Sequence, residues 1–360
     1  MLREHRVHIA YDQTRIVYDL GGQPNSPPII LCDGVGCAGF IWKYLSRDLE
    51  GKYSLIHPNY RGHGRSHTPS DPEHVLIQDH CRDLLGILDQ ENIKRCFQNK
   101  YRAVFHFAAL KAAGDSMDNP GPYSRINIAG SVNILNQMVD SEVQSFIFSS
   151  TASVYGEPEY LPIDESHPLK PLNYYGFTKL LIENLSKWYS ELKGIRYAAL
   201  RYFNAVGYDS NQRILGIEKQ PVNLVPIIME VASGKRDLLE VYGNNYDTPD
   251  GTGIRDYIHV SDLATAHYKA FKYIENKEKN LIVNLSTGSG HSVLEIINTT
   301  KEVTGKNIPY NITQKRKGDP AIVIADSIIA DELLKWKCYH SDIGNSLKTT
   351  WEVYQKKYKD

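Results

Sequence analysis

Two runs of alternating apolar and polar residues open the chain, RVHIAY (6–11) and RIVYDL (15–20), on either side of a polar DQT. Successive side chains of a strand point to opposite faces, so this alternation predicts an antiparallel hairpin over residues 6–20. PPIILC (27–32) and YSLIHP (53–58) are short apolar runs typical of buried strands, and VLIQDHCRDLLGILDQ (75–90) has the apolar spacing of a helix. With a turn and helix predicted over residues 33–45, this part of the chain is interpreted as hairpin, strand, helix, strand, helix.

Further along, AVFHFAAL (103–110) and FIFSSTASVYG (146–156) predict buried strands, and YYGFTK (174–179) opens a helix. Residues four apart share a helix face, so Tyr175 and Lys179 project together. A neighbouring ammonium stabilises phenolate and lowers a tyrosine pKa, which makes Tyr175 a candidate general acid and base. Thr151, at the end of the preceding strand, adds a hydroxyl.

The Tyr-x-x-x-Lys spacing alone is weak evidence, because it occurs four times in this chain. The copies begin at Tyr175, Tyr189, Tyr268 and Tyr273. Only the first follows a strand that ends in small hydroxyl residues, and this context singles it out as the candidate catalytic pair.

Composition narrows the class of protein. A net charge of -1 gives no indication of nucleic acid or an anionic membrane as partner. Membrane spans need about 20 consecutive apolar residues, and the chain has no such run; its start, MLREHRVHIAYD, has no apolar signal core. The five cysteines are scattered without a C-x-x-C pair, so we expect reduced thiols, a cytoplasmic protein and no metal site.

DGVGCAGFIWKYL and NYRGHGRS resemble the N-terminal part of an α/β-hydrolase over about residues 1–95. That family carries its nucleophile in a G-x-S-x-G elbow. The chain contains no G-x-S-x-G, and Ser66 in GHGRS corresponds to a turn residue of that family. Hydrolase activity is therefore the least favoured alternative.

The rest of the chain resembles a different family. HFAALKAAGDS, FIFSSTASVYG, YYGFTK, LRYFNAVG, DGTGIRDYIHVSDLA and KRKGDPAIVIAD are similar to motifs of the UDP-glucose 4-epimerases, in the extended short-chain dehydrogenase/reductase superfamily. The resemblance covers roughly residues 100–360. The chain thus looks like a fusion with a seam near residues 93–102, in which residues 1–95 replace the first Rossmann βαβα and residues 96–360 form an epimerase body.

The two resemblances together imply an α/β fold. We expect a doubly wound, Rossmann-like parallel sheet with an N-terminal antiparallel hairpin and a smaller C-terminal α/β substrate domain, mainly residues 204–240 and 285–350. If PPIILC, YSLIHP and AVFHFAAL act as Rossmann strands 1, 2 and 4, the sheet continues across the seam. Ile29–Leu31 would then lie beside Val104–Phe107, with the hairpin covering the edge beyond YSLIHP.

The cofactor implied by the resemblance is NAD. Gly34, Gly36 and Gly39 form a literal G-x-G-x-x-G between strand and helix, which is typical of a pyrophosphate site. The favoured interpretation is nevertheless that these glycines belong to a hydrolase oxyanion turn, since Asp33 and Asn59 stand where a glycine and an acid are expected. The resemblance also implies NAD contacts from residues of the second half of the cofactor domain, namely Phe107, Ala108, Ala109, Lys111, Asn127, Tyr175 and Lys179.

The implied substrates are UDP-galactose and UDP-glucose, inverted at C4 through a 4-keto sugar, with Tyr175, Lys179 and Thr151 as catalytic residues. Arginine suits phosphate because its planar fork donates two hydrogen bonds. By resemblance, the substrate-binding residues are Asn204, Asn223, Arg255, Arg316 and Asp319, with Val323 where a bulkier residue narrows the sugar pocket of some relatives. Valine there predicts room for N-acetylated sugars. A homodimer through helices of the cofactor domain is also implied.

Three rivals stay open. A sugar-nucleotide 4,6-dehydratase needs an Asp-Glu pair after the threonine, where this chain has Ala152 and Ser153. A UDP-sugar-binding protein without turnover would result if the N-terminal segment cannot hold NAD. The third rival is a fusion that does not fold stably.

Overall fold

The structure is a computed structural model of the 360-residue chain. It describes residues 2–9, 14–23, 26, 28–32, 48–49, 51–58, 66–67, 101–211, 215–218, 220–316 and 319–358. The predicted helices at 33–45 and 75–90, the three glycines at 34, 36 and 39, and most of the seam lie outside these residues. The chain divides into unit 1 (residues 1–149, 178–199 and 270–281) and unit 2 (residues 150–177, 200–269 and 282–360).

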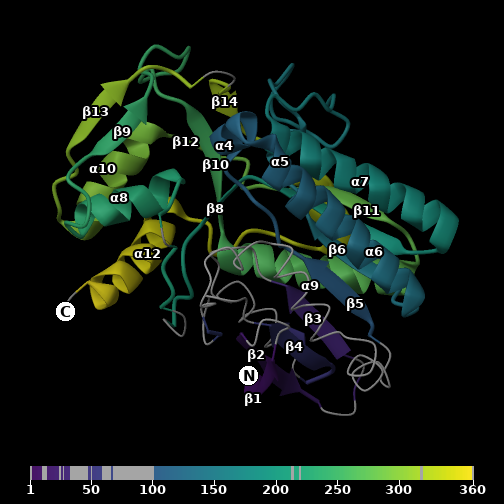
Figure 1. The fold of residues 1–360 in the computed structure, drawn as a ribbon. Helices are drawn as coiled ribbons and strands as arrows, with labels where there is room; N and C mark the ends of the chain where they lie inside the picture. The colour runs from purple at the N-terminus through teal and green to yellow at the C-terminus, as the bar shows by residue number, and fades with distance from the viewer. Residues whose placement is uncertain are drawn as a thin grey trace. The chain divides into compact units, whose positions relative to one another are not determined.

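The main sheet is mostly built by unit 1 (Figure 1). Its strands, in spatial order, are β1 (Leu2–Ile9), β2 (Arg15–Gly22), β4 (Ser54–Pro58), β3 (Pro28–Cys32), β5 (Ala103–His106), β6 (Ser145–Ser149), β7 (Arg196–Tyr202) and β11 (Leu281–Leu285). Strands β3, β4, β5 and β6 pair in parallel, whereas the β1–β2 hairpin joins the edge of β4 antiparallel. The sheet is therefore the α/β, Rossmann-like sheet that the sequence predicts.

The sheet runs without a break from β3 to β5, which lie on opposite sides of the predicted seam. Ile29 pairs with Ala103 and Leu31 with Phe105. These residues are fully buried, because short apolar strands of a parallel sheet are covered on both faces. The prediction that one continuous sheet crosses the seam, with the hairpin beside YSLIHP, is confirmed.

Helices cover both faces of this sheet within unit 1. Successive residues of β5 face opposite sides. The ring of Phe105 packs against Phe271 of α9 (Val260–Lys277), with ring centroids 5.7 Å apart. The next residue, His106, bonds to Ser131 of α6 (Gly130–Asp140) at 2.8 Å. Short helices α4 (Ala113–Asp118) and α5 (Pro120–Tyr123) and a π-helical turn (Ser124–Ala129) lead into α6.

Helix α7 (Tyr174–Lys193) follows a 3₁₀ turn (Ala152–Val154) and a long connection. Its first residues belong to unit 2, and the part from residue 178 onward belongs to unit 1. In unit 1 it runs beside α6 (Figure 1), where the Tyr189 hydroxyl donates to Asn136 at 2.6 Å.

Unit 2 is a second α/β body. Its strands are β8 (Asn204–Val206), β9 (Leu239–Tyr242), β10 (Ile254–His259), β12 (Gly290–Ser292), β13 (Tyr310–Thr313) and β14 (Ile322–Val323). Its helices are α8 (Leu224–Ala232), α10 (Val293–Thr304), α11 (Ile328–Leu334) and α12 (Ile343–Lys357). An apolar core that includes Ile228, Ile296 and Trp351 joins α8, α10 and α12.

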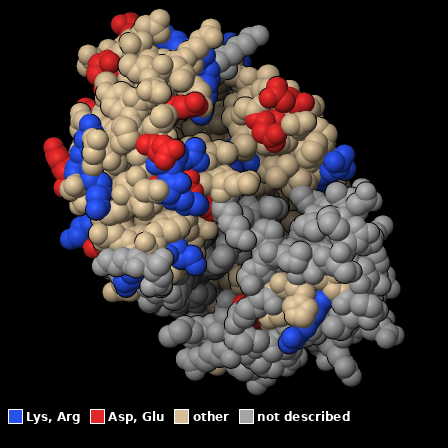
Figure 2. Space-filling view, turned by 60° about the vertical axis from the view of Figure 1, so that its left-hand side comes forward, with Lys and Arg blue, Asp and Glu red and all other residues tan. Residues whose placement is uncertain are grey.

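Charged side chains of both signs are interspersed over the described surface drawn in Figure 2. Among the helices that the structure describes, none combines the length and the apolar character that crossing a membrane requires.

Candidate active site

The start of α7 holds Tyr175 against the turn that follows β6. Asn173 accepts a hydrogen bond from the Gly176 backbone N–H at 2.8 Å, which is the N-cap interaction that favours starting a helix there. A Cβ on Gly176 would lie 2.5 Å from the Ser153 carbonyl oxygen, so only glycine allows the helix and the turn to approach this closely. The Asn173 cap and the small size of Gly176 thus bring Tyr175 close to Thr151.

Thr151 and Tyr175 meet in unit 2, as the sequence predicts. The Thr151 hydroxyl caps the 3₁₀ turn by accepting from the Ser153 backbone N–H at 3.2 Å. Burial raises the pKa of the Tyr175 phenol to about 12, and a hydrogen bond with Thr151 lowers it only in part. Tyr175 therefore holds its proton at neutral pH.

Lys179 lies one helical turn after Tyr175 and is buried among unit 1 residues. Its ammonium donates to the Ser149 carbonyl oxygen at 2.8 Å and lies 4.7 Å from the centroid of the Phe148 ring. Burial lowers the pKa of Lys179 to about 7, while the Glu183 carboxylate acts in the opposite direction.

These two pKa values correct one expectation from the sequence. Proximity to Lys179 was expected to lower the pKa of Tyr175, yet that pKa is raised. The reason is desolvation, which disfavours phenolate and ammonium alike. At neutral pH much of Lys179 is uncharged, so it stabilises phenolate less than an exposed lysine at the same distance would.

Asn127, a predicted cofactor contact, is fully buried. Its side-chain amide accepts from the Leu110 backbone N–H at 2.8 Å and donates to the Leu110 carbonyl at 3.0 Å. It also donates to the Thr178 hydroxyl at 3.0 Å. Asn127 thus fixes the segment after β5 to the π-helical turn and to α7.

The segment that Asn127 holds contains the other predicted cofactor residues. Phe107, Ala108 and Ala109 are partly exposed directly after β5, and Lys111 is exposed. They lie at the carboxyl end of β5, as Ser149 does in the neighbouring parallel strand β6. In doubly wound sheets, ligands bind at this edge.

Two of the predicted substrate residues form an ion pair in unit 2. The guanidinium of Arg255, in β10, pairs with the carboxylate of Asp319 and donates to the Ile254 carbonyl at 2.8 Å. The guanidinium carbon of Arg316 lies 3.8 Å from the centroid of the Tyr242 ring. Arg255 and Asp319 therefore come together, with each engaging the other.

The remaining predicted substrate residues lie on separate elements of unit 2. Asn204 begins β8 beside Tyr257 of β10, and Asn223 is the exposed N-cap residue of α8 without a side-chain cap bond. Val323, in β14, is paired with Arg255.

Sequence reasoning missed several residues of these sites. The backbone carbonyl of Ser149 accepts a hydrogen bond from Lys179, and a pattern of side chains in the sequence does not predict such a contact. Thr178 lies inside the YYGFTK motif and accepts from the buried amide of Asn127, but its burial is a tertiary property. Tyr242 and Tyr246 precede the DGTGIRDYIHV motif in VYGNNY, and their aromatic spacing was the available signal.

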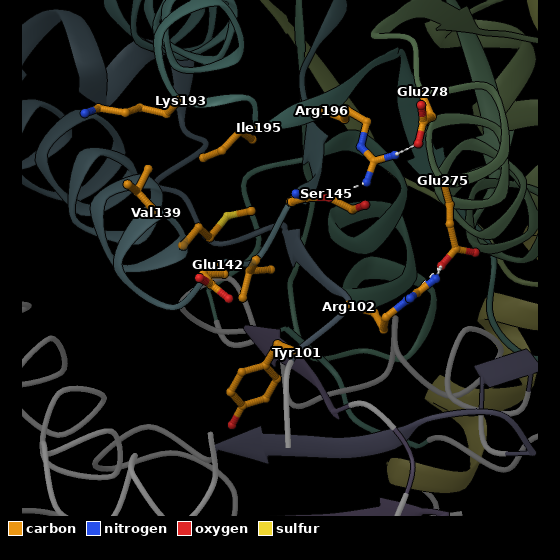
Figure 3. A pocket seen from close by; sticks show the side chains of 13 residues that line it. Tyr101, Arg102, Val139, Glu142, Ser145, Lys193, Ile195, Arg196, Glu275 and Glu278 are labelled. Carbon is orange, nitrogen blue, oxygen red and sulfur yellow. Dashed lines mark hydrogen bonds and ion pairs between the residues drawn. The ribbon is translucent and has the colours of Figure 1, made fainter. Parts of the chain in front are cut away.

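A cavity of about 670 Å³ lies elsewhere in unit 1 (Figure 3). Arg102 and Ser145 line it at the amino ends of β5 and β6, the opposite edge from Ser149. Its arginines are already paired, Arg102 with Glu275 and Arg196 with Glu278. The cavity is thus remote from the candidate catalytic residues of unit 1. Among the described residues, no cluster of His, Cys, Asp and Glu side chains is suited to hold a metal ion.

Comparisons with known proteins agree with this geometry. Residues 35–286 match the model of the NAD dependent epimerase/dehydratase family. The chain is 39% identical over 327 residues to the UDP-glucose 4-epimerase of Lacticaseibacillus casei, covering 89% of this chain and 96% of that protein. It is similar to the crystal structure of a Brucella ovis UDP-glucose 4-epimerase in complex with NAD, with a TM-score of 0.78, 34% identity, and 91% and 98% of the two chains covered. It is also similar to the Bifidobacterium longum enzyme in complex with NAD⁺ and UDP, with a TM-score of 0.76, 34% identity, and 92% and 98% covered.

Proposed function

The chain belongs to the NAD-dependent epimerase/dehydratase family, and we propose that it interconverts UDP-galactose and UDP-glucose by inverting C4 of the hexose. The observation that carries this proposal is the catalytic group Thr151, Tyr175 and Lys179. Thr151 bonds to Tyr175, and the buried Lys179 lies one helical turn further on.

The residues of unit 1 fit the nicotinamide half of NAD. A partly apolar segment, Phe107–Ala109, lies at the carboxyl end of β5, held by the buried Asn127 amide. The Lys179 ammonium and the Ser149 carbonyl add polar groups at the same edge. When NAD is bound, it supplies the hydride acceptor and donor for C4 and a positive charge that favours the phenolate form of Tyr175.

The protein's own part in the reaction is the movement of one proton. Tyr175, as phenolate, takes the proton of the sugar 4-hydroxyl, and as phenol it returns the proton to the same oxygen after C4 is inverted. Thr151 orients the 4-oxygen toward Tyr175 by hydrogen bonding. The high pKa of Tyr175 makes its phenolate a strong base for the first of these two transfers.

The UDP part of the substrate is assigned to unit 2. Arg255 and Arg316 bind the diphosphate, and Asp319 accepts hydrogen bonds from ribose hydroxyls. Substrate binding therefore replaces the Arg255–Asp319 ion pair with contacts to the nucleotide. Asn204 and Asn223 are further substrate contacts, which their exposure supports.

Val323 is proposed to set the width of the sugar pocket. Its side chain is small, and its backbone pairs with that of the phosphate-binding Arg255. UDP-N-acetylgalactosamine is therefore a further substrate. Turnover of UDP-galactose with none of the N-acetyl sugar would contradict this assignment.

Epimerisation is favoured over dehydration. Expulsion of water from a sugar requires an acid near the catalytic tyrosine. Ala152 and Ser153, which follow Thr151 in the 3₁₀ turn, carry no acidic group. The product of the proposed reaction is thus the C4 epimer.

The test uses the purified full chain. Nucleotide released on denaturation is measured against protein, and conversion of UDP-galactose to UDP-glucose is followed. We expect near-stoichiometric NAD and turnover, and we expect Tyr175→Phe to lower kcat by about 10³-fold without changing UDP affinity. UDP binding without NAD uptake in millimolar excess, and without turnover, would instead identify a UDP-sugar-binding protein.

A homodimer and a cytoplasmic location are also proposed. Trp188 and Leu192 are 59% and 69% exposed and lie one turn apart on α7, and an exposed apolar pair of this kind supports packing against a second copy. Replacing both with glutamate should give a monomer in light scattering. Met117→Glu, at a position 60% exposed, is the matched control.

The α/β-hydrolase resemblance of residues 1–95 stays a proposal about the origin of this segment. The family match begins at residue 35, inside the segment, so the comparisons do not support a fusion. Ser66 accepts from the Val17 backbone N–H at 2.8 Å, which gives its hydroxyl a role beside the hairpin. We expect no hydrolysis of p-nitrophenyl acetate above the uncatalysed rate.

A further inference from the structure

Tyr246 carries a buried hydroxyl close to the proposed diphosphate site. The residue is 9% exposed, and no group among the described residues lies within hydrogen-bonding distance of its hydroxyl. Buried polar groups in folded proteins nearly always have a partner, so an exception calls for a specific explanation. A phenylalanine would fill the same space without leaving a polar atom unmet.

Three cationic side chains lie near Tyr246, together with the carboxylates of Asp319 and Glu157. The Lys315 ammonium lies 4.1 Å from the centroid of the Tyr246 ring and donates to the Asn245 carbonyl at 2.7 Å. Arg255 and Arg316, the two arginines assigned to the diphosphate, lie near enough to lower the pKa of the phenol, against the larger effect of burial and that of Asp319. The net effect is a raised pKa, so the hydroxyl keeps its proton and acts as a donor.

Local packing fixes the ring in this place. Gly243 has a φ of +85°, and a Cβ there would lie 2.8 Å from the Tyr246 ring and 2.5 Å from the Lys315 side chain. Glycine therefore lets the ring and the lysine lie against the backbone turn. Lys315 and Arg316 are both exposed, so their side chains can change rotamer and open the ring to a ligand.

We propose that the Tyr246 hydroxyl is a further hydrogen-bond donor to the diphosphate of the UDP-sugar. The assignment rests on the proposed function, because Arg255 and Arg316 define where the diphosphate lies. A neutral donor among cations suits an anion with several acceptor oxygens better than it suits a base or a sugar. The ligand also provides the partner that the hydroxyl lacks among the described residues.

The experiment compares UDP with uridine, which lacks the phosphates, on wild type and Tyr246→Phe. Affinity for UDP is measured by calorimetry and for uridine by competition with UDP-galactose. We expect Tyr246→Phe to weaken UDP binding about tenfold, as for a hydrogen bond to a charged group, to leave uridine binding unchanged, and not to lower the melting temperature. Tyr310→Phe is the matched control, since Tyr310 also lies under a lysine, Lys301 at 5.9 Å, but is exposed.

The possible failures are distinguishable. If wild type binds UDP and Tyr246→Phe binds it equally well, the hydroxyl does not contact the diphosphate. Equal weakening of UDP and uridine, or a lowered melting temperature, would assign Tyr246 a structural role and overturn the proposal. If wild type does not bind UDP, the proposed function fails, and this inference fails with it.

Discussion

Replacing Lys179 with methionine should make the nucleotide-free protein more stable while abolishing turnover. Lys179 is buried, and burial lowers its pKa from 10.5 to about 7. Each pKa unit corresponds to about 1.4 kcal/mol, so keeping this lysine in the folded state costs up to about 5 kcal/mol near neutral pH. Methionine avoids that cost, because it is apolar and of similar length.

The gain is partly offset. Methionine loses the hydrogen bond of the ammonium to the Ser149 carbonyl oxygen, worth about 1.5–3 kcal/mol, and changes the contact with the Phe148 ring. We therefore expect the free energy of unfolding of Lys179→Met to exceed that of wild type by about 2–3 kcal/mol at pH 7. A buried lysine that destabilises its own fold is typical of catalytic groups.

The difference should depend on pH with a definite sign. Between the folded pKa near 7 and the unfolded pKa of 10.5, the unfolded state binds more protons at Lys179, so the stability of wild type rises with pH. The advantage of the variant should thus shrink by about 2 kcal/mol from pH 7 to pH 9. The raised pKa of Tyr175 acts only above its ordinary value of 10 and in both proteins.

Urea denaturation of nucleotide-stripped protein at pH 7, 8 and 9 measures this difference, since bound NAD would add its own stabilisation. Lys187→Met, at an exposed position of the same helix, is the matched control and should show no pH-dependent gain. Parallel stability profiles for wild type and Lys179→Met between pH 7 and pH 9 would refute a depressed pKa. A variant less stable than wild type at pH 7 would refute the estimate that burying Lys179 costs more than its hydrogen bond contributes.

Three further outcomes follow from named contacts. Gly176→Ala places a Cβ 2.5 Å from a backbone carbonyl of the turn after β6. It should lower kcat at least about tenfold by displacing Tyr175. The control Gly130→Ala meets no atom within 4 Å and should leave kcat unchanged. Asn127→Ala removes three hydrogen bonds of a buried side chain and should lower the free energy of unfolding by about 2–4 kcal/mol. NAD retention should fall with it. Asn136→Ala, which loses one exposed hydrogen bond, should cost less than about 1 kcal/mol. Val323→Tyr should abolish turnover of UDP-N-acetylgalactosamine and preserve that of UDP-galactose, as steady-state kinetics will report.

The sheet was predictable because its strands are short, apolar and bounded by turn residues. The alternation of residues 6–20 sets the hairpin, and PPIILC, YSLIHP and AVFHFAAL have the continuous apolar character of buried parallel strands. Connectivity then left few orders for these strands, because crossovers are right-handed and sequential strands tend to be neighbours. That is why the pairing of Ile29–Leu31 with residues 103–105 could be anticipated across a seam where the two resemblances change.

The proximity of the candidate catalytic residues was predictable from the sequence, but their electrostatics were not. Helical spacing brings Tyr175 and Lys179 to one face, and the small hydroxyl residues after β6 indicate Thr151. Desolvation of the two groups depends on neighbours far away in sequence, such as Phe148 beneath Lys179. Two further features depend on tertiary structure, and the periodicity of the sequence does not encode them. They are the hydrogen bonding of Asn127 to Leu110 and the burial of the Tyr246 hydroxyl.

Helix α7 explains why the proximity of the candidate catalytic pair was the most predictable feature of the candidate site. Tyr175 belongs to unit 2 and Lys179 to unit 1, yet both lie on one continuous helix. Residues four apart on a helix keep a spacing that depends only on the local backbone. The spacing of Tyr175 and Lys179 along the helix is therefore given by the sequence YYGFTK alone. Contacts that depend on packing within a single unit cannot be predicted in this way. The Arg255–Asp319 ion pair is one of them, and only the folded structure reveals it.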